Sequence, residues 1–319
     1  MTVFDTSALV PKEWRFRAGQ GPIWTFNPAI FPDGNAGWIF AYRLVFRDGM
    51  RRIAICRLDA QFRVIPDSPV PLSDMIRLER CSEYSEVDRT WFADPRLYRF
   101  DGRLFLYWNT GWHDGPNAQF LMELDSGTMH PRGVPRRLQR DDGRQPIEKN
   151  WTFFGDGPIF ALYSIAGQQI LQWRSEDPES IHLNEVFRTE WDRGAYVREF
   201  GALRGGAPPQ FMDGGYYCFC HSVCHSAIGH RYVPGVYRFD AKPPFAPTHG
   251  PARPVPLPNP FGVPLYPRLN PSVGEVLYPS GAIFDRGNWV ISYGVNDERC
   301  AVARIPHTDI QACLRCLKT

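Results

Sequence analysis

The chain has 319 residues and a formal net charge of +2, with 36 basic and 34 acidic side chains. A balance this even argues against nucleic-acid binding through a general basic field. Aromatic residues make up 14%, and 28 glycines and 30 prolines favour many short strands joined by tight turns over long helices. No apolar run approaches the roughly 20 residues that span a bilayer, and residues 1–16 lack a signal-peptide pattern. We therefore expect a cytoplasmic protein without a membrane partner.

One pattern recurs five times along the chain: an X-Pro or Gly/Pro-rich element, an apolar run, a turn and a second apolar strand. In chain order the copies join 27–31 to 37–42, 94–98 to 102–107, 149–151 to 160–163, 204–209 to 215–220, and 278–281 to 289–293. A spacing of roughly 60 residues suits one four-stranded blade with decorated loops. The sequence therefore predicts an all-β fold, a five-bladed β-propeller, formed by a single domain over residues 1–319.

Two segments do not follow this repeat. Residues 242–271 contain eleven prolines, and since proline donates no backbone hydrogen bond, we expect a long irregular connection between the fourth and fifth blades. Such a connection either lines a site or is a solvated spacer. Near the end, residues 309–317 read as a short helix with Thr308 as its N-cap.

Polar residues of different types stand where each copy of the repeat begins. They are Asn27, Asp94, Lys149, Arg204 and Ser280, while the flanking proline, glycine and aromatic scaffold is retained. In a radial arrangement, equivalent positions of successive blades meet at one end of the central channel. We therefore expect these five side chains to face one pocket.

The repeated motifs resemble those of glycoside hydrolase family 130, five-bladed β-mannoside phosphorylases and their relatives. The matching stretches are Asn27-Pro28-Ala29 with Tyr42-Arg43, Ala93-Asp94-Pro95-Arg96, Lys149-Asn150-Trp151, Gly205 to Pro209 with Tyr217 to His221, Tyr232 to Asp240, and Pro279-Ser280-Gly281 with Tyr293-Gly294 and Asp297. The resemblance implies an enzyme that acts on a glycosidic bond with inversion, and the leading interpretation is a β-mannoside-type glycoside phosphorylase. It also extends to related propeller mannosyltransferases.

By this resemblance Asp94 is the general acid, relaying its proton to the leaving oxygen through a sugar hydroxyl. An acid must hold its proton near neutral pH, so we expect burial or a nearby carboxylate to raise the pKa of Asp94. Arg96, two residues along the strand, is expected on the same face and would oppose that rise. The structural alternative is that Asp94 caps a turn before Pro95.

The resemblance also implies the other site residues. Sugar binding is assigned to Asn27, Arg43, Arg96, Trp151 and Asp297. Phosphate binding is assigned to Lys149, Arg204, His221, Arg231 and Tyr232, a set rich in cations and hydrogen-bond donors. The structural alternatives are solvent-exposed side chains for the charged residues and packing within the blades for the aromatic residues. A hydrolase would instead need a second carboxylate to activate water, for which Glu83, Glu86, Asp88, Asp297 and the less favourably oriented Glu298 are candidates.

The substrate is expected to be an oligosaccharide or small glycoside, with inorganic phosphate or a sugar phosphate as co-substrate and no other cofactor. Residues 118–137 do not reproduce the family's pattern of phosphate-binding arginines. A glycosyltransferase using a nucleotide sugar, a glycoside hydrolase and a non-catalytic sugar-binding propeller therefore stay open, as does an oligomeric state. We expect no metal, because alternation along one strand places Cys218 and Cys220 on the face opposite His221.

Overall fold

A computed structural model describes residues 1–34, 37–76, 78, 91–111, 116–145, 147–226, 229–262 and 268–317. Strands dominate, which confirms the all-β class. The described helices are short: α1 (Thr6–Leu9), η1 (Lys12–Trp14), α2 (Arg15–Ala18), α3 (Leu72–Met75), α5 (Gly194–Phe200) and α6 (His307–Gln311). None of these described helices has the length and apolar character needed to cross a membrane.

The described strands form five antiparallel groups in chain order. The first is β2 (Trp24–Pro32), β3 (Trp38–Val45) and β4 (Arg51–Leu58); the second is β5 (Ala93–Phe100), β6 (Arg103–Asn109), β7 (Gln119–Leu124) and β8 (Pro131–Arg140). The third is β9 (Thr152–Phe154), β10 (Phe160–Ser164), β11 (Gln168–Glu176) and β12 (Ser180–Thr189). The fourth is β13 (Ala202–Arg204), β14 (Gln210–Met212), β15 (Gly215–Ser226), β16 (Gly229–Asp240) and β17 (Pro247–Pro251), with β21 (Leu314–Cys316) beside β17. The fifth is β18 (Val273–Asp285), β19 (Asn288–Val295) and β20 (Arg299–Pro306), completed by β1 (Thr2–Val3).

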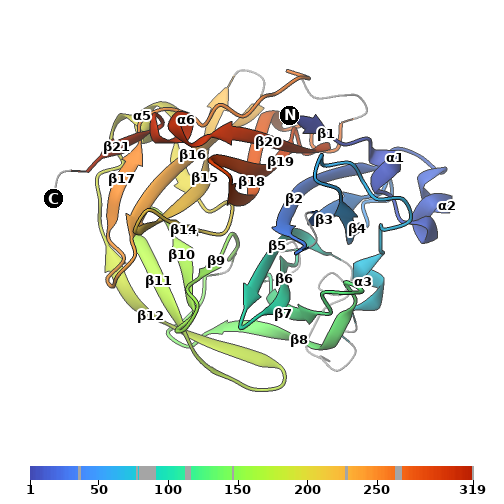
Figure 1. Cartoon of the computed structure of the whole chain (residues 1–319), viewed down its shortest axis with the longest axis horizontal. Helices are drawn as coiled ribbons and strands as arrows, with labels where there is room; N and C mark the ends of the chain where they lie inside the picture. The colour runs from blue at the N-terminus through green and yellow to red at the C-terminus, as the bar shows by residue number, and fades with distance from the viewer. Residues whose placement is uncertain are drawn as a thin grey trace.

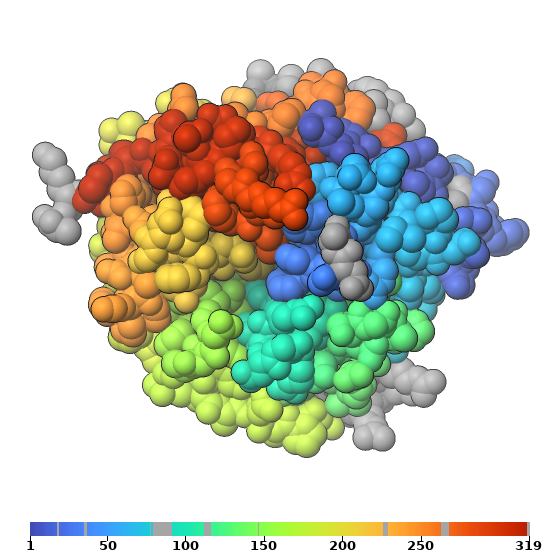
Figure 2. Space-filling model, viewed as in Figure 1, coloured from blue at the N-terminus to red at the C-terminus, as the bar shows by residue number. Residues whose placement is uncertain are grey.

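The groups follow one another around a ring, from β2 in blue to β20 in red (Figure 1). In the space-filling view of the same face, consecutive segments pack directly against each other (Figure 2). Short β1 pairs with β20 through Thr2 opposite Val302, so the N-terminal strand completes the fifth group, whereas the last described strand, β21, lies beside β17 of the fourth.

The last residue of each of the five sequence repeats lies at an equivalent place in its strand group. Tyr42, Tyr107, Tyr163, Cys220 and Tyr293 fall on β3, β6, β10, β15 and β19, the strand that follows each group's inner edge. The repeat detected in the sequence is therefore a structural repeat of one strand pair per group.

Apolar clusters between neighbouring groups explain why the strands read as continuous apolar runs. One cluster joins Ile39 and Ile55 of the first group to Leu106 of the second. Equivalent clusters lie between the second and third groups, the third and fourth, the fourth and fifth, and the fifth and first. Because each group packs against a neighbour on both faces, its strands have no solvent face that would produce alternation.

Two predictions about connections need correction. The Pro-rich segment 242–271 is not irregular throughout, because residues 247–251 form β17, which pairs with both β16 and β21. Pro247 and Pro251 stand at the two ends of this strand, opposite Phe239 and Leu314, and His249 and Gly250 pair between them. The terminal helix spans His307–Gln311, and residues 314–316 form a strand in place of its predicted continuation.

Candidate active site

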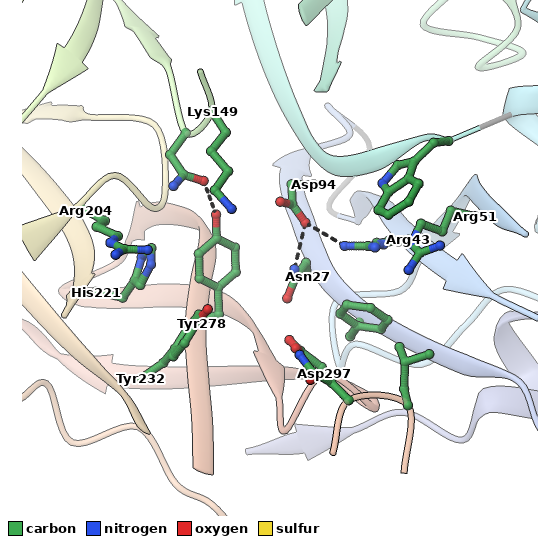
Figure 3. Close-up of a pocket in the computed structure, with 15 residues that line it drawn as sticks. Asn27, Arg43, Arg51, Asp94, Lys149, Arg204, His221, Tyr232, Tyr278 and Asp297 are labelled. Carbon is green, nitrogen blue, oxygen red and sulfur yellow. Dashed lines mark hydrogen bonds and ion pairs between the residues drawn. The ribbon is translucent and has the colours of Figure 1, made fainter. Parts of the chain in front are cut away.

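A cavity of about 410 Å³ opens where the inner strands of the groups converge. Its described lining is polar on most sides and comprises Phe26, Asn27, Arg43, Arg51, Trp91, Asp94, Lys149, Asn150, Arg204, His221, Tyr232, Leu269, Asn270, Tyr278 and Asp297. Asn27, Arg43, Arg51 and Asp94 form one wall, while Lys149, Arg204, His221 and Tyr232 form the opposite one (Figure 3). Tyr278 lies between the two walls and Asp297 below Asn27 in this view.

An X-Pro dipeptide breaks the inner strand of three groups at the cavity. The register shifts between Phe26 and Ala29 in β2, between Ala93 and Arg96 in β5, and between Pro279 and Gly281 in β18. Proline donates no ladder hydrogen bond, so each strand bulges there, and bulges redirect side chains. The residue before each proline, Asn27, Asp94 or Tyr278, lines the cavity.

The register shift in β18 corrects the prediction that Ser280 faces the cavity. Ser280 is fully buried and its hydroxyl donates to the Tyr278 carbonyl over 3.4 Å, so it does not face the cavity. Tyr278 occupies the position equivalent to Asn27 and Asp94. The other four residues expected at the repeat starts, Asn27, Asp94, Lys149 and Arg204, do line one cavity, as predicted.

Asp94 is held by partners from the neighbouring group. The Nδ2 of Asn27 donates to Asp94 Oδ1 over 2.8 Å, and Arg43 Nη1 lies 3.4 Å from the same oxygen. The Asp94 side chain keeps 15% exposure, toward the cavity. Arg43 is fixed in turn by its position over the Phe26 ring, 4.8 Å from the centroid. The carboxylate is thus oriented, accessible and charge-paired.

The pKa of Asp94 shifts in the direction opposite to that expected of a resting acid. Burial alone would raise it, but Arg43 and Arg96, the hydrogen bond from Asn27 and the charge of Lys149 together lower the pKa of Asp94 below its ordinary value of 3.8. The expectation of a raised pKa is therefore wrong. Asp94 is a carboxylate at neutral pH, which makes it a proton acceptor.

The pKa of Asp297 shifts in the opposite direction. This residue follows β19 in the connection to β20, with Asn296 and Asp297 both at positive φ. Burial, reinforced by the negative charge of Asp94, raises the pKa of Asp297 although Arg43, Asn270 and Lys149 oppose the rise. Two carboxyl groups whose pKa values are pushed apart take different roles, one ionised and one more readily protonated.

The opposite wall concentrates cations and donors. Arg204 and His221 are directly paired across β13 and β15, and Tyr232 stacks on the His221 ring with centroids 5.2 Å apart. Burial and the charges of Arg204 and Arg43 lower the pKa of Lys149. Such mutual repulsion among cations is what an anionic ligand relieves.

His221 is neutral in this setting. Burial and the charges of Arg204 and Lys149 lower its pKa to about 3. Its Nδ1 is buried and has no hydrogen-bond partner among the described residues. His221 can therefore donate or accept a hydrogen bond in the cavity but carries no charge of its own there.

The burial of His221 predicts that the stability of the protein depends on pH. The unfolded chain protonates His221 near pH 6.5 and the folded chain only near pH 3, so stability falls as pH drops through this window, with a slope approaching 1.4 kcal/mol per pH unit. Between pH 7 and 5, His221→Gln should lose about 2 kcal/mol less stability than the wild type in urea unfolding. The partners of His182 raise its pKa, so His182→Gln should show the opposite sign. Parallel pH curves for wild type and His221→Gln would contradict the assignment.

Three residues assigned to the site lie outside the cavity lining. Arg96 is fully buried beneath it, and Trp151 is buried and packs on Tyr163 with ring centroids 5.2 Å apart. Arg231 points away and pairs with Glu275 over 2.9 Å. In contrast, Asn27, Arg43, Asp94, Asp297, Lys149, Arg204, His221 and Tyr232 are brought together.

The cavity also contains residues that the sequence did not single out for these roles. Tyr278 donates to Asn150 Oδ1 over 2.8 Å, and Arg51 and Asn270 line the wall near Arg43 and Asp297. The dipeptide Tyr278-Pro279 carried the same signal as Asn27-Pro28 and Asp94-Pro95. No local sequence pattern distinguishes Arg51 from the arginines that lie outside the cavity. Leu269 and Asn270 show that the Pro-rich segment contributes to the site.

The base candidates Glu83, Glu86 and Asp88 lie outside the described residues. Among the residues that the structure describes, no three His, Cys, Asp or Glu side chains are grouped so as to hold a metal ion.

Gly294 is the residue that lets Asn27 approach Asp94. A Cβ at position 294 would clash with the Oδ1 and the backbone nitrogen of Asn27. We expect Gly294→Ala to displace Asn27 and lower turnover by roughly 100-fold, since a shift of about 1 Å can cost that much. The measurement is kcat together with a melting temperature. Gly19→Ala, whose Cβ would meet only an ordinary contact with Phe16 O at 3.5 Å, is the control. Unchanged kcat in Gly294→Ala would contradict this role.

Comparisons with known proteins identify the fold. No protein-family model and no curated protein matches the sequence. The chain is similar to β-1,2-mannobiose phosphorylase from Listeria innocua, solved with β-1,2-mannobiose, with 14% identity and a TM-score of 0.64 over 97% of this chain and 98% of that one. It is also similar to a mannose phosphorylase from Leishmania mexicana, solved with a phosphate ion, with 12% identity and a TM-score of 0.54 over 93% and 87%.

A third similar structure represents the GH130 family of mannoside phosphorylases, which contains glycoside hydrolases that target β-1,2-mannosidic linkages in Candida mannan. Here the identity is 14% and the TM-score 0.57, over 93% of this chain and 87% of that one. The resemblance stated from the motifs is thus confirmed at the level of structure: the chain has the fold of the GH130 mannoside phosphorylases.

Proposed function

We propose that the chain is a five-bladed β-propeller enzyme that acts with inversion on a β-mannoside-type bond, as a glycoside phosphorylase. The five strand groups in a ring, each packed on two neighbours, support the propeller. The observation that carries the activity is the two-walled cavity, with a carboxylate wall around Asp94 and a cationic wall around Lys149 and Arg204.

The cationic wall suits phosphate. Phosphate carries up to two negative charges near neutral pH and forms strong hydrogen bonds with charged donors. Lys149 and Arg204 supply two positive charges, and His221 and Tyr232 supply neutral hydrogen-bonding groups. Binding an anion there would relieve the repulsion that lowers the pKa of Lys149.

The carboxylate wall suits a sugar and a proton transfer. Asn27 and Asp297 offer groups for sugar hydroxyls, and Asp94 is ionised. In the synthetic direction, the bond from the anomeric carbon to the phosphate oxygen breaks, a bond to the acceptor oxygen forms with inversion, and the acceptor's proton passes to Asp94. The reverse reaction returns that proton. A bound phosphate dianion would raise the pKa of Asp94 and so help it act as the acid.

Hydrolysis fits the described lining less well. An inverting hydrolase needs a base carboxylate roughly 6.5–9.5 Å from the acid. Asp94 and Asp297 are the only carboxylates among the described residues of the lining, and Asp297 has a raised pKa that weakens it as a base.

The test is release of phosphate from mannose 1-phosphate in the presence of acceptor sugars, with GDP-mannose as a parallel donor. We expect turnover with mannose 1-phosphate, and Arg204→Gln should raise the KM for phosphate in the reverse reaction by roughly 10- to 150-fold. Arg231→Gln is the matched control, since Arg231 is an exposed arginine of the same strand group outside the cavity. Turnover with GDP-mannose alone would replace the proposal with a glycosyltransferase. Sugar binding without turnover from either donor would leave a sugar-binding propeller.

A further inference from the structure

Arg51 is a cation of the cavity that the proposed reaction does not use. It opens β4, and its guanidinium lies over the Trp91 ring, 3.5 Å from the centroid. Figure 3 places it beside Arg43, on the wall opposite Lys149 and Arg204. It is therefore on the side of the cavity where the sugar is proposed to bind, away from the proposed phosphate site.

Arg51 forms no ion pair with either carboxyl group of the described lining. Arg43 is paired with Asp94 at 3.4 Å, Asp297 has a raised pKa, and Lys149 and Arg204 together match the two charges of a phosphate dianion. Among the described residues no carboxylate lies within ion-pair distance of Arg51. A partly buried cation without a counter-ion is costly, so a site that maintains one favours an anionic ligand.

The geometry of Arg51 is suited to a carboxylate. Its Nη1 donates to the Gly49 carbonyl over 2.8 Å, and stacking on Trp91 fixes the plane of the guanidinium. Its Nε is buried and has no partner among the described residues. Stacking uses the face of the guanidinium and leaves in-plane N–H groups, which match the two oxygens of a carboxylate.

Burial and the neighbouring charge of Arg43 lower the pKa of Arg51 to about 10, although the negative charge of Asp94 opposes the shift. That value still leaves the side chain charged at neutral pH. Desolvation and repulsion by Arg43 therefore act on a cation that persists, and an added negative charge would relieve both.

We propose that Arg51 binds the carboxylate of an acidic sugar, so that the substrate or acceptor of this cavity contains a uronic acid. The inference rests on the proposed function only in placing a sugar beside Asp94. A carboxylate is favoured over a phosphate group as the ligand of Arg51 because the neighbouring Arg43 is already paired with Asp94, which leaves one arginine on this wall for one negative charge.

The test is isothermal titration of the whole protein with D-mannuronate, D-mannose and mannose 6-phosphate at neutral pH and low salt. We expect mannuronate to bind at least about tenfold more tightly than mannose. Arg51→Gln should abolish this preference by weakening mannuronate alone, and Arg51→Lys should retain part of it because it keeps the charge without the planar fork. Arg99→Gln is the matched control: this exposed arginine also lies over an aromatic ring, that of Phe31 at 5.5 Å, but outside the cavity.

Equal binding of mannuronate and mannose, no binding of mannuronate at millimolar concentration, or a preference that survives in Arg51→Gln would overturn the proposal. So would tighter binding of mannose 6-phosphate than of mannuronate, or weaker binding of inorganic phosphate to Arg51→Gln. Because the measurement needs no turnover, an Arg51-dependent preference in a protein that fails to use mannose 1-phosphate would overturn the proposed reaction and leave this subsite standing.

Discussion

Asp94→Asn is expected to lower kcat by roughly 100- to 10,000-fold, the range attributed to general acid–base catalysis. The substitution keeps an oxygen that can accept the 2.8 Å hydrogen bond from Asn27 but removes the charge that pairs with Arg43. It also removes the proton acceptor. The readout is phosphate release from mannose 1-phosphate and acceptor, measured with the melting temperature to verify folding.

Asp285→Asn is the matched control, because Asp285 is an aspartate of β18 that pairs with Arg304 over 2.8 Å away from the cavity. It should leave kcat unchanged. Asp297→Asn should act mainly on KM for the sugar, since its proposed contacts are with hydroxyls. An Asp94→Asn enzyme within tenfold of the wild type would refute the catalytic assignment.

The ring of strand groups could be predicted because its physical cause is repeated in the sequence. Each group needs the same apolar strand pair to pack on two neighbours, and Tyr42, Tyr107 and Tyr163 mark equivalent points of that pair. The long Pro-rich segment was harder to interpret. Its strand at 247–251 forms only because β16 and β21, far apart in the chain, provide edges on both sides.

The faces of individual side chains were less predictable, because bulges break the period of two. Arg96 was expected beside Asp94 on the cavity face, but the register shift between Ala93 and Arg96 turns its side chain into the interior. In β16 no bulge intervenes between Arg231 and Tyr232. Neighbouring residues of a strand face opposite sides, so both could not line the cavity.

Of the groups that lower the pKa of Asp94, only Arg96 could be identified from the sequence near it. The groups that lower its pKa include Arg43 and Asn27 from the first strand group and Lys149 from the third. Only the convergence of three groups brings them within reach. The motif predicted a protonated acid, but in the folded protein the lowered pKa makes Asp94 a carboxylate at neutral pH; the proposed acid role would require an anion nearby to raise that pKa.

Arg96 predicts the largest effect on stability, because it joins three strand groups beneath the cavity. Its Nε donates to the Gly206 carbonyl over 2.8 Å, its Nη1 to the carbonyls of Asp94 and Pro95 over 3.1 and 2.9 Å, and its Nη2 to the Tyr278 hydroxyl over 2.6 Å. Gly206 belongs to the fourth group and Tyr278 to the fifth. All these contacts are buried or nearly so, and water cannot easily replace them.

Arg96→Met should therefore lower the free energy of unfolding by about 3–5 kcal/mol, because it leaves buried acceptors without donors while filling a similar volume. Urea unfolding at neutral pH measures the change, and failure to recover folded protein would agree with it. Arg99→Met, on the same strand but exposed, should change stability by less than about 0.5 kcal/mol. A loss below about 1 kcal/mol in Arg96→Met would mean that the groups hold together without this side chain. Arg96→Lys should lose less stability than Arg96→Met but more than Arg99→Met, since an ammonium keeps the charge but cannot reach four acceptors in one plane.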